Sequence, residues 1–149
     1  MAANQTIFIP INMQPLQIFH LDDHRIFADG LVNAVRKWFP NAVFKNIQNG
    51  DEALAYLKSI LVLNKRLDLI VTDINHPGMR GIEFATEVRI IEKAFGRRTP
   101  ILFITMVDDD YTHEKAENIP LVKYVTKTTS PEDVSLAINE LVKNGLSSK

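Results

Sequence analysis

Short apolar runs alternate with helix-type patterns along most of the chain, and this alternation constrains the fold more than any other feature. Five runs rich in β-branched, aromatic and leucine residues predict strands. They are residues 16–21, 42–47, 67–72, 101–105 and 121–126. Because parallel strands need long crossover connections, a helix between successive strands predicts a parallel sheet with helices on both faces.

The segments between the runs place apolar residues at the spacing of one helix face. Each of these segments therefore predicts an amphipathic helix that packs on the sheet. The three stripes are Phe27, Leu31, Val35 and Trp38; Ala53, Leu54, Leu57 and Leu61; and Phe84, Val88, Ile91 and Phe95. The mostly polar segment 108–118 predicts only a short helix.

The last predicted helix has the clearest start signal. Ser130 suits the N-cap, Pro131 suits the first helical position, and Asp133 suits the positive end of the helix dipole. We expect this helix to end near Asn144 and Gly145, because glycine is common directly after a helix C-terminus. Its apolar stripe is Val134, Ala137, Ile138 and Leu141.

The apolar character of each run predicts its place in the sheet. Residues 16–21, 67–72 and 101–105 read as buried central strands, whereas residues 42–47 alternate as an edge strand does. These patterns predict an α/β fold, a flavodoxin-like three-layer sandwich with a five-stranded parallel sheet in order 2-1-3-4-5 and about five helices. In such sheets a ligand binds beyond the carboxyl ends of the strands where the strand order reverses, here between the first and third strands.

The composition indicates one domain without a charge field that would attract nucleic acid or a membrane. The chain has 149 residues, with 17 basic and 18 acidic side chains and a formal net charge of -1. The absence of cysteine excludes disulfides and thiolate sites and fits a cytoplasmic location. The apolar runs are too short to span a bilayer. We expect a flexible N-terminal leader (1–15), a domain (16–144) and a C-terminal tail (145–149).

Polar side chains stand where the predicted strands end. Asp22 and Asp23 follow the first strand, Asp73 follows the third, Thr105 closes the fourth and Lys127 follows the fifth. Because the carboxyl ends of parallel strands share one edge of the sheet, we expect these side chains to surround one crevice. Carboxylates about 4 Å apart repel by roughly 4 kcal/mol per pair, so a cation is needed. Oxygen ligands select Mg²⁺, or alternatively Mn²⁺, and such a site suits phosphoryl transfer.

Each of these residues also has an ordinary structural interpretation when it is taken alone. Either aspartate after the first run could cap the next helix, Thr105 could be a strand residue, and Lys127 could be a solvated charge. A transition-metal site is a further alternative, since His24 and His76 lie close in sequence to the acidic residues. A loop histidine near carboxylates is, however, more often a hydrogen-bonded neighbour than a ligand.

Taken together, the matched positions resemble the receiver domain of two-component response regulators. The motifs are the acidic pair in "HLDDH", "DINHPGMRG" with proline and glycine four and eight residues after Asp73, Thr105 at the end of "ILFIT", and Lys127 in "YVTK". The resemblance runs from about Leu16 to Val142. It implies a regulatory protein that catalyses only its own phosphorylation and dephosphorylation.

The resemblance implies a role for each residue of the crevice. Asp73 is expected to accept a phosphoryl group from a sensor histidine kinase or a phosphotransfer protein. Mg²⁺ is expected to bind Asp23, Asp73 and the backbone carbonyl of Asn75, with Asp22 bound through water. Lys127 is expected to pair with a phosphoryl oxygen.

Two more residues are implied to carry the signal to the surface. The Thr105 hydroxyl would bind another phosphoryl oxygen, and Tyr124 would switch its rotamer, although Tyr124 also fits a half-buried core aromatic. The expected output is a contact with a downstream protein or a second copy of the chain, with no membrane contact and no direct contact with nucleic acid. The stretch "LDDHRIFADGL" also resembles receivers that precede DNA-binding domains, so a fragment of a transcriptional regulator is the alternative.

Two other classes fit the same architecture less well. A magnesium-dependent phosphatase with an aspartyl nucleophile would need an acid/base carboxylate two residues after Asp73, where this chain has Asn75. A flavin-binding module would need a phosphate-binding loop after the first strand, where the acids of "LDDHR" would repel phosphate.

Overall fold

The computed structural model describes residues 14–22, 24–73, 81–105, 114, 119, 122–126 and 130–147, and for residues 105, 122–126 and 145–147 it describes the backbone alone. The strands are β1 (Gln17–Leu21), β2 (Val43–Ile47), β3 (Leu69–Asp73), β4 (Ile101–Thr105) and β5 (Val122–Thr126). The helices are α1 (Arg25–Trp38), α2 (Gly50–Val62), α3 (Gly81–Phe95) and α5 (Pro131–Ser147). The helix predicted at 108–118 lies outside the described residues, apart from Glu114.

The five strands form one parallel sheet in the order β2-β1-β3-β4-β5, as predicted. Most strands begin one or two residues later than the apolar runs suggested. β3 also extends one residue further, so that Asp73 is the last residue of the strand. The edge position of β2 agrees with its exposure pattern, in which none of its residues is buried.

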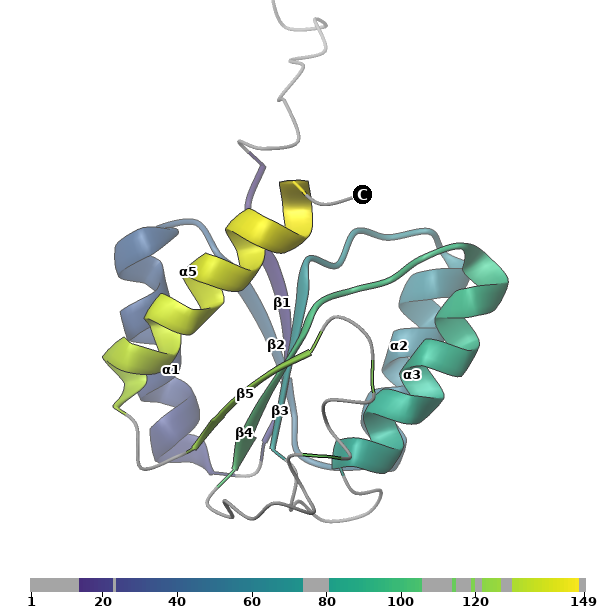
Figure 1. The fold of residues 1–149 in the computed structure, drawn as a ribbon, viewed down its shortest axis with the longest axis horizontal. Coiled ribbons are helices and arrows are strands. Elements are labelled where there is room, and N and C mark those ends of the chain that lie inside the picture. Colours follow the sequence, from purple (N-terminus) through teal and green to yellow (C-terminus); the bar gives the residue numbers. More distant parts are fainter. Residues whose placement is uncertain are drawn as a thin grey trace, which may run out of the picture.

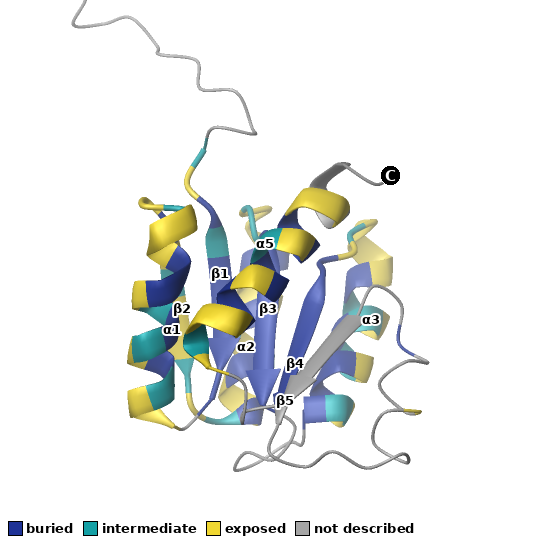
Figure 2. Cartoon of the chain, turned by 60° about the vertical axis from the view of Figure 1, so that its left-hand side comes forward, coloured by how far each residue is buried: buried dark blue, intermediate teal, exposed yellow. Residues whose placement is uncertain are grey.

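Helices cover both faces of the sheet. α1 and α5 pack against each other on one face, and α2 and α3 pack on the other (Figure 1). Successive residues of the central strands point to opposite faces of the sheet. Val71 and Leu102 belong to the hydrophobic cluster under α1 and α5, whereas Ile70 and Phe103 belong to the cluster under α2 and α3. The central strands β1, β3 and β4 are therefore buried on both faces, and many exposed residues lie on the outer helix surfaces (Figure 2).

The predicted helix stripes are buried near their centres and exposed at two of their ends. Trp38 and Phe95 close their stripes but are 48% and 44% exposed. The indole of Trp38 on α1 donates to the Ser135 hydroxyl oxygen on α5 at 3.2 Å, so it still links the two helices. Within the described ranges, no helix has the length and apolar character needed to cross a membrane.

The start of the last helix agrees with the prediction from the sequence, but its end does not. Ser130 accepts the backbone N–H of Asp133 at 3.2 Å and Pro131 opens α5, as predicted. The predicted end near Asn144 and Gly145 is wrong, since α5 continues to Ser147. A single glycine costs a helix only about 1 kcal/mol relative to alanine, and no proline follows to stop it. By contrast, Gly96 does close α3, with a φ of 64°.

A buried ion pair fixes the chain between α3 and β4. Glu92 is 1% exposed, contacts the Arg89 guanidinium at 2.6 Å and accepts the backbone N–H of Thr99 at 2.9 Å. Arg89 also donates to the Thr99 carbonyl oxygen at 2.8 Å. Burial lowers the pKa of Arg89, and the charge of Glu92 opposes this shift. The pair therefore orients the segment that leads into the central strand β4.

A second buried carboxylate joins the starts of β1 and β3. Asp68 accepts the backbone N–H of Gln17 at 2.8 Å and pairs with the Nε of Arg66 at 2.9 Å. Its own backbone N–H donates to the Gln17 carbonyl oxygen at 2.9 Å. These contacts fix the register of β1 against β3. The carboxyl ends of the two strands therefore lie at the same level in the sheet.

Candidate functional site

Asp22 and Asp73 meet at the carboxyl ends of β1 and β3. Leu21 pairs with Thr72 in the sheet, so the next residue on each strand reaches the same level. Asp22 is 1% exposed and Asp73 is 3% exposed. A carboxylate oxygen of each lies, together with a ring nitrogen of His24, in a group whose members are all within 4.8 Å of one another.

The loop after β1 is held by the neighbouring edge strand. Asn46 on β2 pairs with His20 in the sheet and donates from its side-chain amide to the carbonyl oxygens of His20 and Asp22, at 3.0 and 3.3 Å. The backbone N–H of Asp22 donates to the Ile47 carbonyl oxygen at 3.2 Å. The role of Asn46 was not predicted from the sequence. Asn46 is the last residue but one of the predicted edge strand, and this position could have indicated that its side chain lies near the loop after β1.

Asp22 does not act as an ordinary cap of α1. The N-cap residue is His24, whose side chain makes no capping hydrogen bond. Asp22 instead accepts the backbone N–H of His24 at 2.9 Å, in a bond that fixes its carboxylate at the end of β1. The carboxylate is thereby held close to Asp73 rather than against the first turn of the helix.

Two histidines contact the acidic pair. The Nδ1 atom of His24 lies 2.9 Å from Oδ1 of Asp22 and 3.5 Å from Oδ2 of Asp73, and 51% of its side chain is exposed. His20 is 1% exposed, and its Nε2 lies 3.5 Å from Oδ2 of Asp22. The proximity of His24 to the carboxylates agrees with the alternative raised from the sequence. The contact of His20 was not foreseen, because a histidine inside a strand gives no sign of which neighbour it meets.

The remaining predicted site residues are described in part or not at all. Thr105 ends β4, where Ile104 pairs with Asp73, so its backbone lies one position beyond the level of Asp73. Tyr124 pairs with Phe103 within the sheet, and only its backbone is described. The other three predicted site residues, Asp23, Asn75 and Lys127, lie outside the described residues, as does His76.

The chemistry of the described donors fits a divalent cation. Two buried carboxylates at this separation repel, and a cation between them removes the repulsion. Carboxylate oxygens are the protein ligands that Mg²⁺ prefers. A carboxylate at a cation site is also a competent nucleophile towards phosphorus. The arrangement can therefore support phosphoryl transfer to one of the two aspartates.

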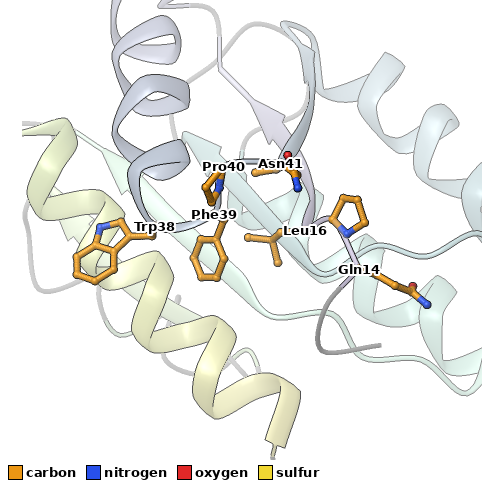
Figure 3. Close-up of a pocket in the computed structure, with 8 residues that line it drawn as sticks. Gln14, Leu16, Trp38, Phe39, Pro40 and Asn41 are labelled. Carbon is orange, nitrogen blue, oxygen red and sulfur yellow. The ribbon is translucent and has the colours of Figure 1, made fainter. Parts of the chain in front are cut away.

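A pocket at the opposite end of the sheet lacks these features. It lies where α1 leads into β2 and the chain enters β1, and residues such as Leu16, Trp38 and Phe39 line it (Figure 3). None of its lining residues has a titratable side chain. The pocket therefore offers neither an ionisable metal ligand nor a nucleophile.

Comparison with known proteins gives consistent matches over most of the chain. A family model described as the response regulator receiver domain matches residues 18–139. The nitrate/nitrite response regulator protein NarL of Escherichia coli (strain K12) is 25% identical over 129 residues, which cover 87% of this chain and 56% of NarL. The transcriptional regulatory protein ResD of Bacillus subtilis (strain 168) is 30% identical over 103 residues, which cover 69% of this chain and 39% of ResD. The chain thus spans about half the length of these relatives, or less.

A solved structure supports the same fold. The chemotaxis response regulator CheY4 of Vibrio cholerae superposes with a TM-score of 0.70 at 21% identity. The match covers 86% of this chain and 99% of CheY4. The parallel sheet and the helices packed on its two faces are therefore common to both proteins.

Proposed function

Because the chain belongs to the response regulator receiver domain family, we propose that it accepts a phosphoryl group on Asp73 in a Mg²⁺-dependent reaction. The observation that carries this proposal is the meeting of two buried carboxylates, Asp22 and Asp73, at the carboxyl ends of neighbouring strands. Of the two, Asp73 terminates the central strand β3, between the acidic loop after β1 and the end of β4.

In the proposed reaction, a carboxylate oxygen of Asp73 attacks the phosphorus of a phosphohistidine on a sensor kinase or phosphotransfer protein. The new O–P bond makes an acyl phosphate, while the N–P bond of the donor breaks and the leaving imidazole nitrogen takes up a proton. Little covalent chemistry is asked of the protein, so positioning and charge neutralisation account for most of the catalysis. The burial of Asp73 restricts the directions from which a donor approaches.

Asp22, Asp23 and Asp73 would hold the cation, with the carbonyl oxygen of Asn75. Bound Mg²⁺ would neutralise the carboxylates and the phosphoryl oxygens. Asp22 is suited to this part, since its backbone N–H bonds to β2 and its carboxylate is fixed by the N–H of His24. Asn46 supports the same loop from the edge strand.

Lys127 and Thr105 would contact the phosphoryl oxygens, and Tyr124 would report the change. The position of Thr105 at the end of β4, one residue beyond the partner of Asp73, supports its part. A phosphoryl group adds about -1.5 to -2 charges. Moving a two-state equilibrium from 1:99 to 99:1 would require about 5.5 kcal/mol of differential stabilisation. The shifted surface would bind a downstream protein or a second copy of the chain.

A regulator with an attached DNA-binding output is the second candidate. It is favoured by the match to NarL and ResD, of which this chain spans 56% and 39%. The reaction at Asp73 would be the same in both cases, and the two differ only in what the phosphorylated surface controls.

The test is phosphorylation of the purified protein by a small acyl phosphate such as acetyl phosphate, with and without Mg²⁺. Intact-mass spectrometry should show one added phosphoryl group that alkali removes and that requires Mg²⁺. Asp73→Asn should abolish the addition, whereas Asp29→Asn, which changes an exposed carboxylate on α1, should leave it unchanged. Full labelling of Asp73→Asn would show that the acceptor is elsewhere.

A further inference from the structure

We propose that the cation site of this chain also takes a borderline divalent transition-metal ion such as Co²⁺, Ni²⁺ or Zn²⁺, with Nδ1 of His24 as a direct ligand. The inference rests on the proposed function in so far as Asp22 and Asp73 are the other ligands. It adds to that function a nitrogen ligand and, with it, a different selectivity among metal ions.

The position of His24 matches that of a ligand. A metal ion about 2.1 Å from each ligand atom, at angles of about 90 to 109°, holds those atoms roughly 3.0 to 3.4 Å apart. Nδ1 of His24 lies 2.9 Å from Oδ1 of Asp22 and 3.5 Å from Oδ2 of Asp73. The two carboxylate oxygens lie within 4.8 Å of each other, so they would approach by up to about 1.4 Å when the three groups surround one ion.

The imidazole of His24 already forms a hydrogen bond with Asp22, between Nδ1 and Oδ1 at 2.9 Å, and a metal ion would replace this bond. His24 is the N-cap residue of α1, but its side chain makes no capping hydrogen bond. Its side chain is 51% exposed, so water and ions reach it, while the two carboxylates beneath it are buried.

A second, independent observation comes from the protein interior. His20 is 1% exposed, and its Nε2 has no hydrogen-bond partner within the described part of the chain. This nitrogen lies 3.5 Å from Oδ2 of Asp22 but forms no hydrogen bond with it. A buried polar atom left without a hydrogen bond destabilises the folded protein. A cation that fixes the Asp22 carboxylate would allow Oδ2 to accept a bond from His20, as neighbouring groups commonly orient metal ligands.

The donor set determines the preference among metal ions. Mg²⁺ binds oxygen ligands and gains little from an imidazole, whereas Co²⁺, Ni²⁺ and Zn²⁺ bind imidazole nitrogen well. These ions would occupy the same carboxylates as Mg²⁺, so the two classes would exclude each other. The availability of a transition metal would thus regulate which cation is present when Asp73 meets its phosphoryl donor.

The experiment uses the full chain without a polyhistidine tag and titrates Co²⁺ and Mg²⁺ separately by calorimetry. His24→Gln should weaken Co²⁺ binding by at least about tenfold and change Mg²⁺ binding by less than about twofold. Asp29→Asn, which changes an exposed carboxylate on α1, is the control and should change neither. In the proton NMR spectrum of the Co²⁺ form, a strongly shifted exchangeable imidazole resonance should be present in the unmutated protein and absent from His24→Gln.

Equal Co²⁺ affinity in the unmutated protein and in folded His24→Gln, as judged by circular dichroism, would overturn the inference. So would persistence of the shifted imidazole resonance in that variant. Phosphorylation of Asp73 with Mg²⁺ alone separates this result from the proposed function. If His24→Gln is phosphorylated normally but binds Co²⁺ undiminished, only the role of His24 fails. If the unmutated protein is not phosphorylated, the function of Asp73 fails instead.

Discussion

Replacing Asp73 with asparagine should make the metal-free protein more stable, although it removes the proposed phosphoacceptor. Asp73 is 3% exposed, and one of its carboxylate oxygens lies within 4.8 Å of a carboxylate oxygen of Asp22, which is also buried. Asparagine has nearly the same shape and keeps one oxygen as an acceptor, so the main change is the loss of one negative charge. The free energy of unfolding should therefore rise.

The size of the effect follows from the separation of the two carboxylates. Two unit charges at the 4.8 Å upper limit of this group repel by about 3.5 kcal/mol at an effective dielectric constant of 20, and they repel more at a shorter separation. The His24 imidazole lies close to both carboxylates, and its hydrogen bond with Asp22 offsets part of this repulsion. We expect a net gain of about 1 to 3 kcal/mol, because the pair is partly compensated.

The assay is urea denaturation followed by circular dichroism, with a chelator and again with Mg²⁺. At a Mg²⁺ concentration ten times its dissociation constant, binding adds about 1.4 kcal/mol to the unmutated protein. The same concentration should add almost nothing to Asp73→Asn. Asp68→Asn is the control: this buried carboxylate pairs with Arg66 and Gln17, so its neutralisation should lower stability by about 1 to 3 kcal/mol in either buffer.

A metal-free Asp73→Asn protein less stable than the original would refute the reasoning. It would mean that attractive contacts of Asp73 outweigh its repulsion with Asp22. Equal stabilisation of both proteins by Mg²⁺ would show that the cation binds at a different place.

Three further substitutions test the supports of the fold and site by calorimetry and denaturation. Glu92→Ala should lower the free energy of unfolding by about 3 kcal/mol, because it leaves the partly buried Arg89 guanidinium and the buried Thr99 N–H without this acceptor. Asn49→Ala should cost about 1 kcal/mol, since Asn49 accepts two backbone N–H groups at the start of α2. Asn46→Ala should reduce the free energy of Mg²⁺ binding by more than it reduces the free energy of unfolding. The reason is that it removes the hydrogen bond to the backbone of Asp22 and so loosens the loop that positions this ligand.

The sheet order and the meeting of Asp22 with Asp73 could be predicted from local patterns. Continuous apolar runs indicate central strands, and alternating ones indicate edges, so the placing of β2 at an edge followed from its residues alone. Residues directly at the carboxyl ends of adjacent parallel strands must be neighbours. The closeness of Asp73 to Asp22 could therefore be predicted from the order and direction of the strands, without knowledge of any side-chain contact.

The supporting contacts depend on pairings that the sequence does not display. The bonds of Asn46 exist because β2 pairs with β1 in one register, His20 opposite Asn46. From the sequence, Arg89 and Glu92 would be expected to lie exposed on a helix surface, because charged residues are usually solvated. In the structure, the backbone of Thr99 forms hydrogen bonds with both side chains. The continuation of α5 through Gly145 likewise shows that its other residues outweigh the weak helix propensity of one glycine.

The division of the apolar side chains between the two faces of the sheet has a consequence for how this chain can change. The side chains under α1 and α5 form one cluster, and those under α2 and α3 form another. Energetic effects of substitutions in separate clusters usually add. One flank can therefore be remodelled for a new binding partner while the opposite flank keeps its packing, and the pair of aspartates at the strand ends is retained throughout.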